Sequence, residues 1–211
     1  MTISEELVLY TNPMSRGRIA RWMLEEVGQT YRTELLEYGT SMKSAEYLSV
    51  NPMGKVPAVA HRGMVVTEAA AICAYLADAF PQAQLAPPHG HPLRGLYYRW
   101  MFFAAGPLET AITANSLGLL APADKAAMVG YGSFDQAVDA LEVAVTSGGP
   151  YLLGTQFTAA DVYVGSQVLW GLMLKTLPER PAFVEYGQRL RAREAYQRAA
   201  ALDDTAMPKK Q

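Results

Sequence analysis

The stretches Asn51-Pro-Met-Gly-Lys-Val-Pro57 and Val66-Thr-Glu-Ala-Ala-Ala-Ile-Cys-Ala-Tyr-Leu76 decide the fold of this chain. The first is a loop that leads into a predicted strand at residues 56–60. A second predicted strand, at 64–66, follows after an Arg-Gly turn and ends directly before a predicted helix at 68–80. That helix carries an apolar stripe with helical spacing, made of Ile72, Tyr75, Leu76 and Phe80. A strand pair that leads into an amphipathic helix is therefore expected here.

The segments before this pair alternate between strand and helix patterns. Residues 7–10 form a short apolar strand, and Ser15 opens a helix that ends at Gly28. Residues 31–37 are predicted as a strand and residues 41–50 as a helix. The predicted order up to residue 80 is therefore β-α-β-α-β-β-α, which is a mixed α/β domain.

The rest of the chain has a different character. Residues 81–92 include four prolines, a composition typical of a linker. Beyond them the periodicity is helical, over residues 93–117, 123–145, 159–174 and from 181 onward. The sequence predicts an α/β domain at 1–81, a linker at 82–92 and an all-helical domain at 93–211.

Composition and charge exclude several classes of protein. The chain has 211 residues, is 50% hydrophobic and carries 18 basic and 20 acidic side chains, for a net charge of −2. A globular protein is expected, and a nucleic-acid-binding protein is not, because such proteins normally carry a basic excess. No apolar run approaches the roughly 20 residues that a membrane helix needs. The N-terminus is acidic and polar, unlike a signal peptide.

The single cysteine and three histidines argue against a disulfide or a metal centre. Cys73 has no partner cysteine, and its position within a predicted helix indicates a small buried hydrophobic side chain. The histidines lie at positions 61, 89 and 91, without the spacing of zinc ligands. These features fit a reducing compartment, and a cytoplasmic location is expected.

Four stretches together resemble the cytosolic glutathione transferase family. They are residues 10–18 (YTNPMSRGR), 51–57, 66–76 and 154–161 (GTQFTAAD), in this order and separated by the linker. The resemblance covers nearly the whole chain and is closest to the bacterial and plant-like members that use serine. It implies a thioredoxin-like domain followed by an all-helical domain, glutathione as co-substrate, and a homodimer.

Three residues of the first loop are implied to bind glutathione. The resemblance implies a cis peptide bond before Pro57. Such a bond would present the backbone of Val56 to the extended tripeptide as a strand does. Lys55 has two interpretations of equal weight: it meets the glycine carboxylate of glutathione, or it is an ordinary solvated lysine.

Two residues at the start of the next helix are implied to hold the γ-glutamyl group. Glu68 would bind its ammonium, and the N–H groups of the helix terminus would bind its carboxylate. The structural alternative is that Glu68 is an acidic residue at the start of the helix, where a negative charge interacts favourably with the helix dipole. Ala69 stands where the family usually has serine. The missing hydroxyl removes a bond worth about 1.5–3 kcal/mol.

Ser15 is the candidate catalytic residue. By resemblance, its hydroxyl donates to the glutathione sulfur and lowers the pKa of the thiol. The structural alternative is a helix N-cap, for which serine is among the best residues. Tyr10, Asn12 and Arg18 are the alternatives for sulfur activation, because the alignment of this segment can slide by a position or two.

The remaining motifs concern folding and the second substrate. Thr158 and Asp161 form a capping box, for which a structural role is expected rather than a catalytic one. The aromatic run at 96–103 predicts a helix covered on nearly all sides, by the core, a second subunit or the pocket for an apolar electrophile. A glutathione S-transferase is therefore predicted, with conjugation as the default reaction and peroxidase, dehalogenase or isomerase activity left open. A non-catalytic ligand-binding or interaction module of the same fold is the alternative.

Overall fold

The computed structural model describes residues 6–208, which pack as two compact units. Within the described range, the first unit contains residues 6–83 together with 193–208, and the second contains Gln84–Ala192. The division by packing therefore differs from the division along the chain into 1–81, 82–92 and 93–211. The last helix, α9 (Glu194–Thr205), packs with the α/β unit, where it contacts the first helix, α1 (Gly17–Val27).

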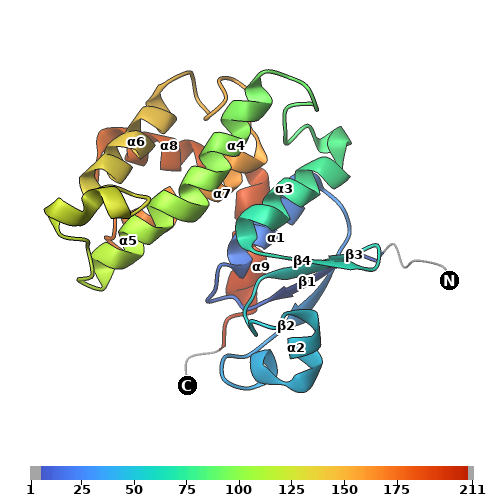
Figure 1. Ribbon diagram of the computed structural model, residues 1–211. Helices are drawn as coiled ribbons and strands as arrows, with labels where there is room; N and C mark the ends of the chain where they lie inside the picture. Colours follow the sequence, from blue (N-terminus) through green and yellow to red (C-terminus); the bar gives the residue numbers. More distant parts are fainter. Residues whose placement is uncertain (1–5, 209–211) are drawn as a thin grey trace. The chain divides into compact units, whose positions relative to one another are not determined.

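The first unit is built on a four-stranded sheet with the order β2-β1-β3-β4 (Figure 1). Its strands are β1 (Val8–Thr11), β2 (Arg32–Leu35), β3 (Ala58–His61) and β4 (Met64–Thr67). β1 runs parallel to β2, whereas the β1–β3 and β3–β4 pairs are antiparallel. This is the thioredoxin-like arrangement expected from the sequence.

Helices α1 and α3 (Ala69–Ala79) pack against each other and against the sheet, and the short α2 (Ala45–Val50) follows β2 (Figure 1). The core between α1, α3 and the strands is apolar, with Leu9, Met23, Ile72 and Leu76 at 0% exposure. Cys73 lies in this core, and burial raises the pKa of its thiol. The cysteine therefore acts as a small hydrophobic residue, as expected.

The second unit is helical. Its helices are α4 (Leu93–Phe103), α5 (Glu109–Ser116), α6 (Phe134–Thr146), α7 (Ala159–Met173) and α8 (Pro181–Arg191). α7 is buried on nearly every side and contacts both α4 and α8. The segment before α4 is attached to this unit, because Leu85 is buried and its carbonyl accepts the Ala159 N–H at 2.7 Å.

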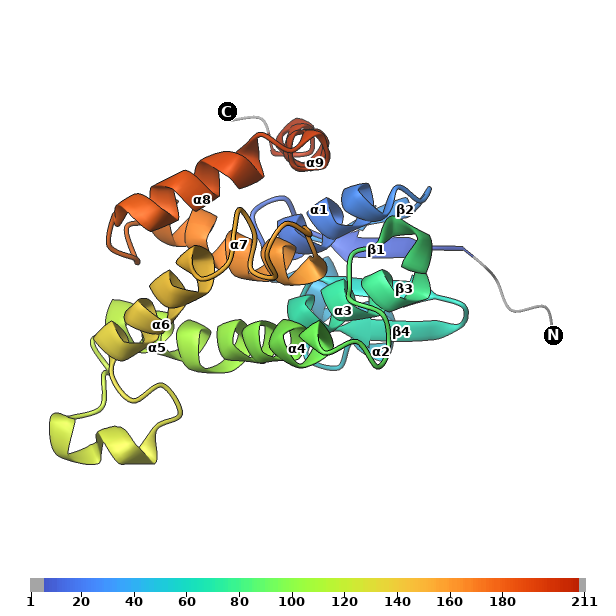
Figure 2. The ribbon, with the colours of Figure 1, turned by 90° about the horizontal axis from the view of Figure 1, so that it is seen from above.

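Two helices of the second unit differ from the prediction. The helix expected over 93–117 is one rod in which five residues, Ala104–Leu108, wind as a π-helix between α4 and α5 (Figure 2). Pro107 lies in this segment, where it lacks the N–H that an α-helix would use. The helix expected over 123–145 is wrong as a single element. It divides into a 3-10 segment, Ala123–Met128, and α6, with Gly130 and Gly132 between them.

The predicted helix over residues 41–50 is also interrupted. Ser41–Lys43 form a 3-10 turn, and α2 begins after Ser44, whose side chain accepts the Tyr47 N–H. Serine favours such an N-cap over a position within a helix. Among residues 6–208, no helix combines the length and the apolar character that crossing a membrane requires.

Candidate functional site

The loop before β3 is fixed by its own side chains. Asn51 is 3% exposed, and its amide donates to the Lys55 carbonyl at 2.8 Å. The Tyr47 hydroxyl donates to the same carbonyl at 2.7 Å. Gly54 has a φ of +56°, and a Cβ there would lie 2.7 Å from the Met42 carbonyl oxygen, so only glycine fits. The loop therefore holds one conformation.

This loop ends in a cis Val56–Pro57 peptide bond, as the resemblance implied. Within residues 6–208, the backbone N–H and C=O of Val56 make no hydrogen bond. Val56 is half-buried and precedes β3, so its backbone is open to an extended ligand. The Lys55 side chain is exposed beside it. The two interpretations of Lys55 both fit this position.

The start of α3 is open. Glu68 is the residue before the helix, with a φ of +66°, an unfavourable value for a residue that is not glycine. Its side chain is exposed and makes no capping hydrogen bond within the described part of the chain. The first intrahelical bond runs from the Ile72 N–H to the Glu68 carbonyl, at 2.9 Å. The N–H groups of the first helical turn therefore lack intrahelical acceptors. Ala69 is 8% exposed.

Ser15 lies in the turn between β1 and α1. Its hydroxyl is 2.7 Å from the Asn12 carbonyl oxygen, to which it donates, and it accepts the Gly17 N–H at 2.9 Å. The regular helix begins at Gly17, and the Ser15 hydroxyl makes the hydrogen bond of an N-cap to the N–H two residues on, although Arg16 is the residue directly before the helix. Ser15 is 7% exposed. The hydroxyl has one hydrogen, so donation to a ligand requires it to turn away from Asn12.

Two of the alternatives to Ser15, Asn12 and Arg18, have their polar groups engaged, whereas the Tyr10 hydroxyl makes no hydrogen bond among residues 6–208. The Asn12 amide donates to the Leu36 carbonyl at 2.7 Å. The Tyr10 ring packs against Tyr47 with the centroids 5.6 Å apart. Burial raises the pKa of the Tyr47 hydroxyl to about 12, so this group stays neutral at physiological pH. The Arg18 guanidinium binds the Pro13 carbonyl and Asp204.

The register of the sheet brings the predicted residues to one end. Tyr10 of β1 lies opposite Ala58 of β3, and Ala58 lies opposite Thr67 of β4. The Ser15 turn follows β1, the Val56–Pro57 bond precedes β3, and Glu68 follows β4. All three segments therefore lie at the same end of the sheet, where β1 and β4 finish and β3 begins. The helices α1 and α3 also begin there, and the positive ends of their dipoles favour an anionic ligand.

A group of ion pairs between α1 and α9 was missed by the sequence reasoning. Arg21 donates to Asp203 at 2.8 Å, with the side chains only 5% and 1% exposed. Burial raises the pKa of the Asp203 carboxyl, whereas the charge of Arg21 opposes that rise. The sequence signal was the Asp203-Asp204 pair in the last turn of a helix. A negative charge is unfavourable at that end of the helix dipole, so these residues need a cationic partner.

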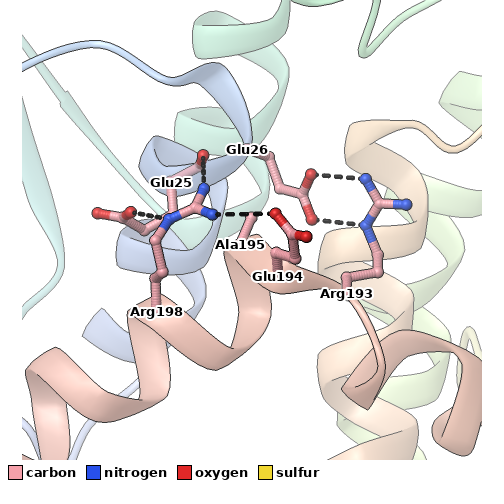
Figure 3. Close-up of a pocket in the computed structure, with 6 residues that line it drawn as sticks. All are labelled: Glu25, Glu26, Arg193, Glu194, Ala195 and Arg198. Carbon is pink, nitrogen blue, oxygen red and sulfur yellow. Dashed lines mark hydrogen bonds and ion pairs between the residues drawn. The ribbon is translucent and has the colours of Figure 1, made fainter.

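A shallow cavity of about 320 Å³ lies further along the same two helices (Figure 3). Arg193 forms two bonds of 2.7 Å with the Glu26 carboxylate, and Arg198 donates to Glu25 at 3.1 Å. Trp22 donates to Glu26 at 2.8 Å. The carboxylates of Glu25 and Glu26 are thus already paired with arginines. We therefore interpret the cavity as part of the contact between the two segments rather than as a binding site for a charged ligand.

Comparison with known proteins gives one consistent result. Residues 5–78 match the family model described as "Glutathione S-transferase, N-terminal domain". Glutathione S-transferase GstA of Escherichia coli O157:H7 is 27% identical over 135 residues, which are 62% of this chain and 64% of that protein. The chain spans less than two thirds of the length of the curated relatives that it matches first, 14% of one and 64% of the next.

Solved structures resemble the chain over nearly its full length. A glutathione transferase from Methylococcus capsulatus is 28% identical, with a TM-score of 0.78 over 94% of this chain and 99% of that one. A sphingomonad glutathione S-transferase, solved in complex with glutathione, is 25% identical, with a TM-score of 0.75 over 93% of this chain and 98% of that one.

Proposed function

We propose that this chain, which is similar to glutathione transferases over nearly its full length, is an enzyme that binds glutathione and presents its thiolate to an apolar electrophile. The observation that carries the proposal is the shared end of the sheet. The open backbone of Val56, the open start of α3 and the Ser15 turn meet there. A tripeptide needs all three: a strand-like partner, a place for its charged end, and a donor at its sulfur.

The backbone and the start of α3 bind the two ends of the ligand. The cysteinyl part of glutathione pairs with the backbone N–H and C=O of Val56. Its γ-glutamyl carboxylate accepts from the N–H groups at the start of α3, and its ammonium pairs with Glu68. Lys55 is assigned to the glycine carboxylate, because its side chain is exposed directly beside Val56.

Ser15 then acts on the sulfur. A thiol of pKa about 8.5 is only a few per cent ionised at pH 7. The Ser15 hydroxyl turns from the Asn12 carbonyl and donates to the thiolate, while the start of α1 adds favourable electrostatics. A charge-assisted bond of about 1.5–3 kcal/mol lowers the pKa by roughly one to two units. The thiolate attacks the electrophile and expels its leaving group; conjugation is the default reaction.

Substitution of Ser15 by alanine tests this assignment. We expect turnover of an aryl halide with glutathione to fall about tenfold or more, and the pH at which activity appears to rise. The free energy of unfolding should fall by only about 1 kcal/mol. Unchanged turnover with an unchanged pH profile would move the assignment to Tyr10 or Asn12. Glutathione binding without turnover in the unsubstituted protein would favour the non-catalytic module.

The proposal includes a cytoplasmic homodimer. Helix α4 presents Phe102 at 73% exposure and Tyr98 at 39%. Large aromatic side chains at such exposure are typical of a surface that a second subunit covers. Light scattering at micromolar concentration should give twice the mass of one chain, and a monomer would contradict this part of the proposal.

A further inference from the structure

The turn that carries Ser15 is held from outside by Arg18. The Nε of Arg18 donates to the Pro13 carbonyl at 2.6 Å, a short bond between a cation and the middle of the turn. Within the turn, the Ser15 N–H donates to the Asn12 carbonyl at 3.0 Å. The position of the serine hydroxyl therefore depends on a backbone segment that Arg18 fixes.

Arg18 also forms an ion pair with the last helix, in which the Arg18 side chain is 28% exposed and the Asp204 side chain 68%. The Nη2 of Arg18 lies 2.7 Å from Oδ1 of Asp204, a residue of α9 that lies 186 positions further along the chain. Guanidinium has a planar fork of donors, so one arginine can hold a carbonyl and a carboxylate at once. The Pro13 carbonyl, Arg18 and Asp204 thus form one chain of contacts.

The buried ion pair between Arg21 and Asp203 fixes the position of α9 against α1. Arg21 and Asp203 are almost fully buried, and Arg21 also reaches the hydroxyls of Tyr31 and Thr33 at 3.3 Å. A buried arginine with several partners has little freedom to move. Asp204 follows Asp203 directly, so the buried pair places its carboxylate opposite Arg18.

We infer that Arg18 is a positioning residue for sulfur activation, which Asp204 of the C-terminal helix holds in place. The inference rests on the proposed function of Ser15. Arg18 does not meet the sulfur in this role. It keeps the Asn12–Ser15 turn in the one geometry from which the Ser15 hydroxyl can reach the thiolate.

The chain contains a matched control for this role. Arg198 also joins α9 to α1, through Glu25, but Glu25 lies in the second half of α1, away from the turn. Arg198→Met removes an ion pair between the same two helices and leaves the turn contacts in place. A general loosening of α9 should affect both variants alike, whereas a positioning role should affect Arg18→Met alone.

The experiment compares Arg18→Met, Arg18→Lys, Asp204→Asn and Arg198→Met in the full chain. We measure turnover at saturating glutathione, the thiol pKa of bound glutathione from its ultraviolet thiolate absorbance, and hydrogen exchange of the Ser15 and Gly17 amides. For Arg18→Met we expect turnover about tenfold lower, a thiol pKa raised by about one unit, at least tenfold faster exchange, and glutathione affinity within about twofold. Arg198→Met should match the unsubstituted protein.

The two remaining variants separate position from charge. Lysine keeps the charge but lacks the fork, so Arg18→Lys should remain impaired. Asp204→Asn leaves the charge of Arg18 unbalanced. If that charge acted directly on the sulfur, this variant would lower the thiol pKa, whereas loss of positioning raises it and lowers turnover about threefold.

Full recovery in Arg18→Lys, a lowered thiol pKa in Asp204→Asn, or an equal effect of Arg198→Met would each overturn the inference. Unsubstituted protein that fails to bind glutathione overturns the proposed function, and the inference with it. The amide exchange separates the two failures, because it reports on the turn without glutathione.

Discussion

Helices α3 and α7 begin in opposite ways. At α7, the Asp161 carboxylate accepts the Thr158 N–H at 2.9 Å, and it is 0% exposed. At α3, the residue before the helix is an exposed glutamate with a positive φ and no capping bond within the described residues. The start of α7 satisfies its own backbone donors, whereas the start of α3 leaves its donors open. A buried, closed helix end serves folding, and an open, strained one is suited to a ligand.

The largest effect is expected from removing the closed end. Asp161 accepts four hydrogen bonds, from the Leu152 N–H, from the N–H and hydroxyl of Thr158, and from the Tyr186 hydroxyl. Asp161→Ala leaves these buried donors unpaired and should lower the free energy of unfolding by about 4 kcal/mol, measured in urea. Asp135→Ala, at the exposed first turn of α6, is the control and should cost under about 0.5 kcal/mol. Equal losses would contradict the comparison.

The Asp161 carboxyl at the start of α7 should also titrate within an accessible pH range. Burial raises the pKa of Asp161 to about 6, although its four hydrogen bonds act in the opposite direction. The native state then binds a proton at a pH where the unfolded chain does not, so stability rises as the pH falls from about 6.5 to about 4. A shift of two units corresponds to about 3 kcal/mol. Urea unfolding of the unsubstituted protein and of Asp161→Asn at several pH values should diverge accordingly, and parallel curves would rule this out.

The open end should respond in binding rather than in stability. Glu68→Ala removes the proposed partner of the γ-glutamyl ammonium and should weaken glutathione binding about tenfold, measured by calorimetry. The free energy of unfolding should change by less than about 0.5 kcal/mol, because the side chain is exposed. Glu46→Ala, in the first turn of α2, is the matched control and should leave binding unchanged. A loss of stability without a loss of affinity would make Glu68 a structural residue.

The smallest effect is a gain. Ala69→Ser adds a hydroxyl at the first position of α3, where we propose that the γ-glutamyl carboxylate accepts from the backbone N–H groups. An imperfect bond to that charge is worth about 1 kcal/mol, which is roughly a fivefold tighter affinity for glutathione by calorimetry. If Ala69→Ser and Glu68→Ala both leave the affinity unchanged, the γ-glutamyl group does not bind at this helix end.

Local sequence patterns predicted the fold well where the interacting residues lie within a few positions of each other. The capping box at Thr158 and Asp161 was predicted because both halves lie within four residues, and the structure confirms it. The order of strands and helices up to α3 is also confirmed. The break before α6 was missed, because residues 123–145 keep a helical period across Gly130 and Gly132.

Long-range contacts escaped the sequence reasoning. Nothing in the sequence near Arg18 or Arg21 indicates a partner more than 180 positions away. The start of α1 lies two residues after Ser15, whose hydroxyl accepts the Gly17 N–H as an N-cap does and also donates to the Asn12 carbonyl. Which hydrogen bonds the Ser15 hydroxyl makes depends on tertiary packing, which the sequence alone does not reveal.

The contact of α9 with α1 also bears on how the chain is synthesised. A ribosome that has released residues 1–83 has delivered every strand of the sheet, but Asp203 is still 120 codons away. Until then, the guanidinium of Arg21 has no carboxylate from α9 to neutralise it. The first unit to leave the ribosome is therefore the last to be completed. A nascent chain stalled before α9 would leave the α9-facing side of α1, with Arg21 and the Trp22 ring that packs on Tyr196, uncovered and accessible to chaperones.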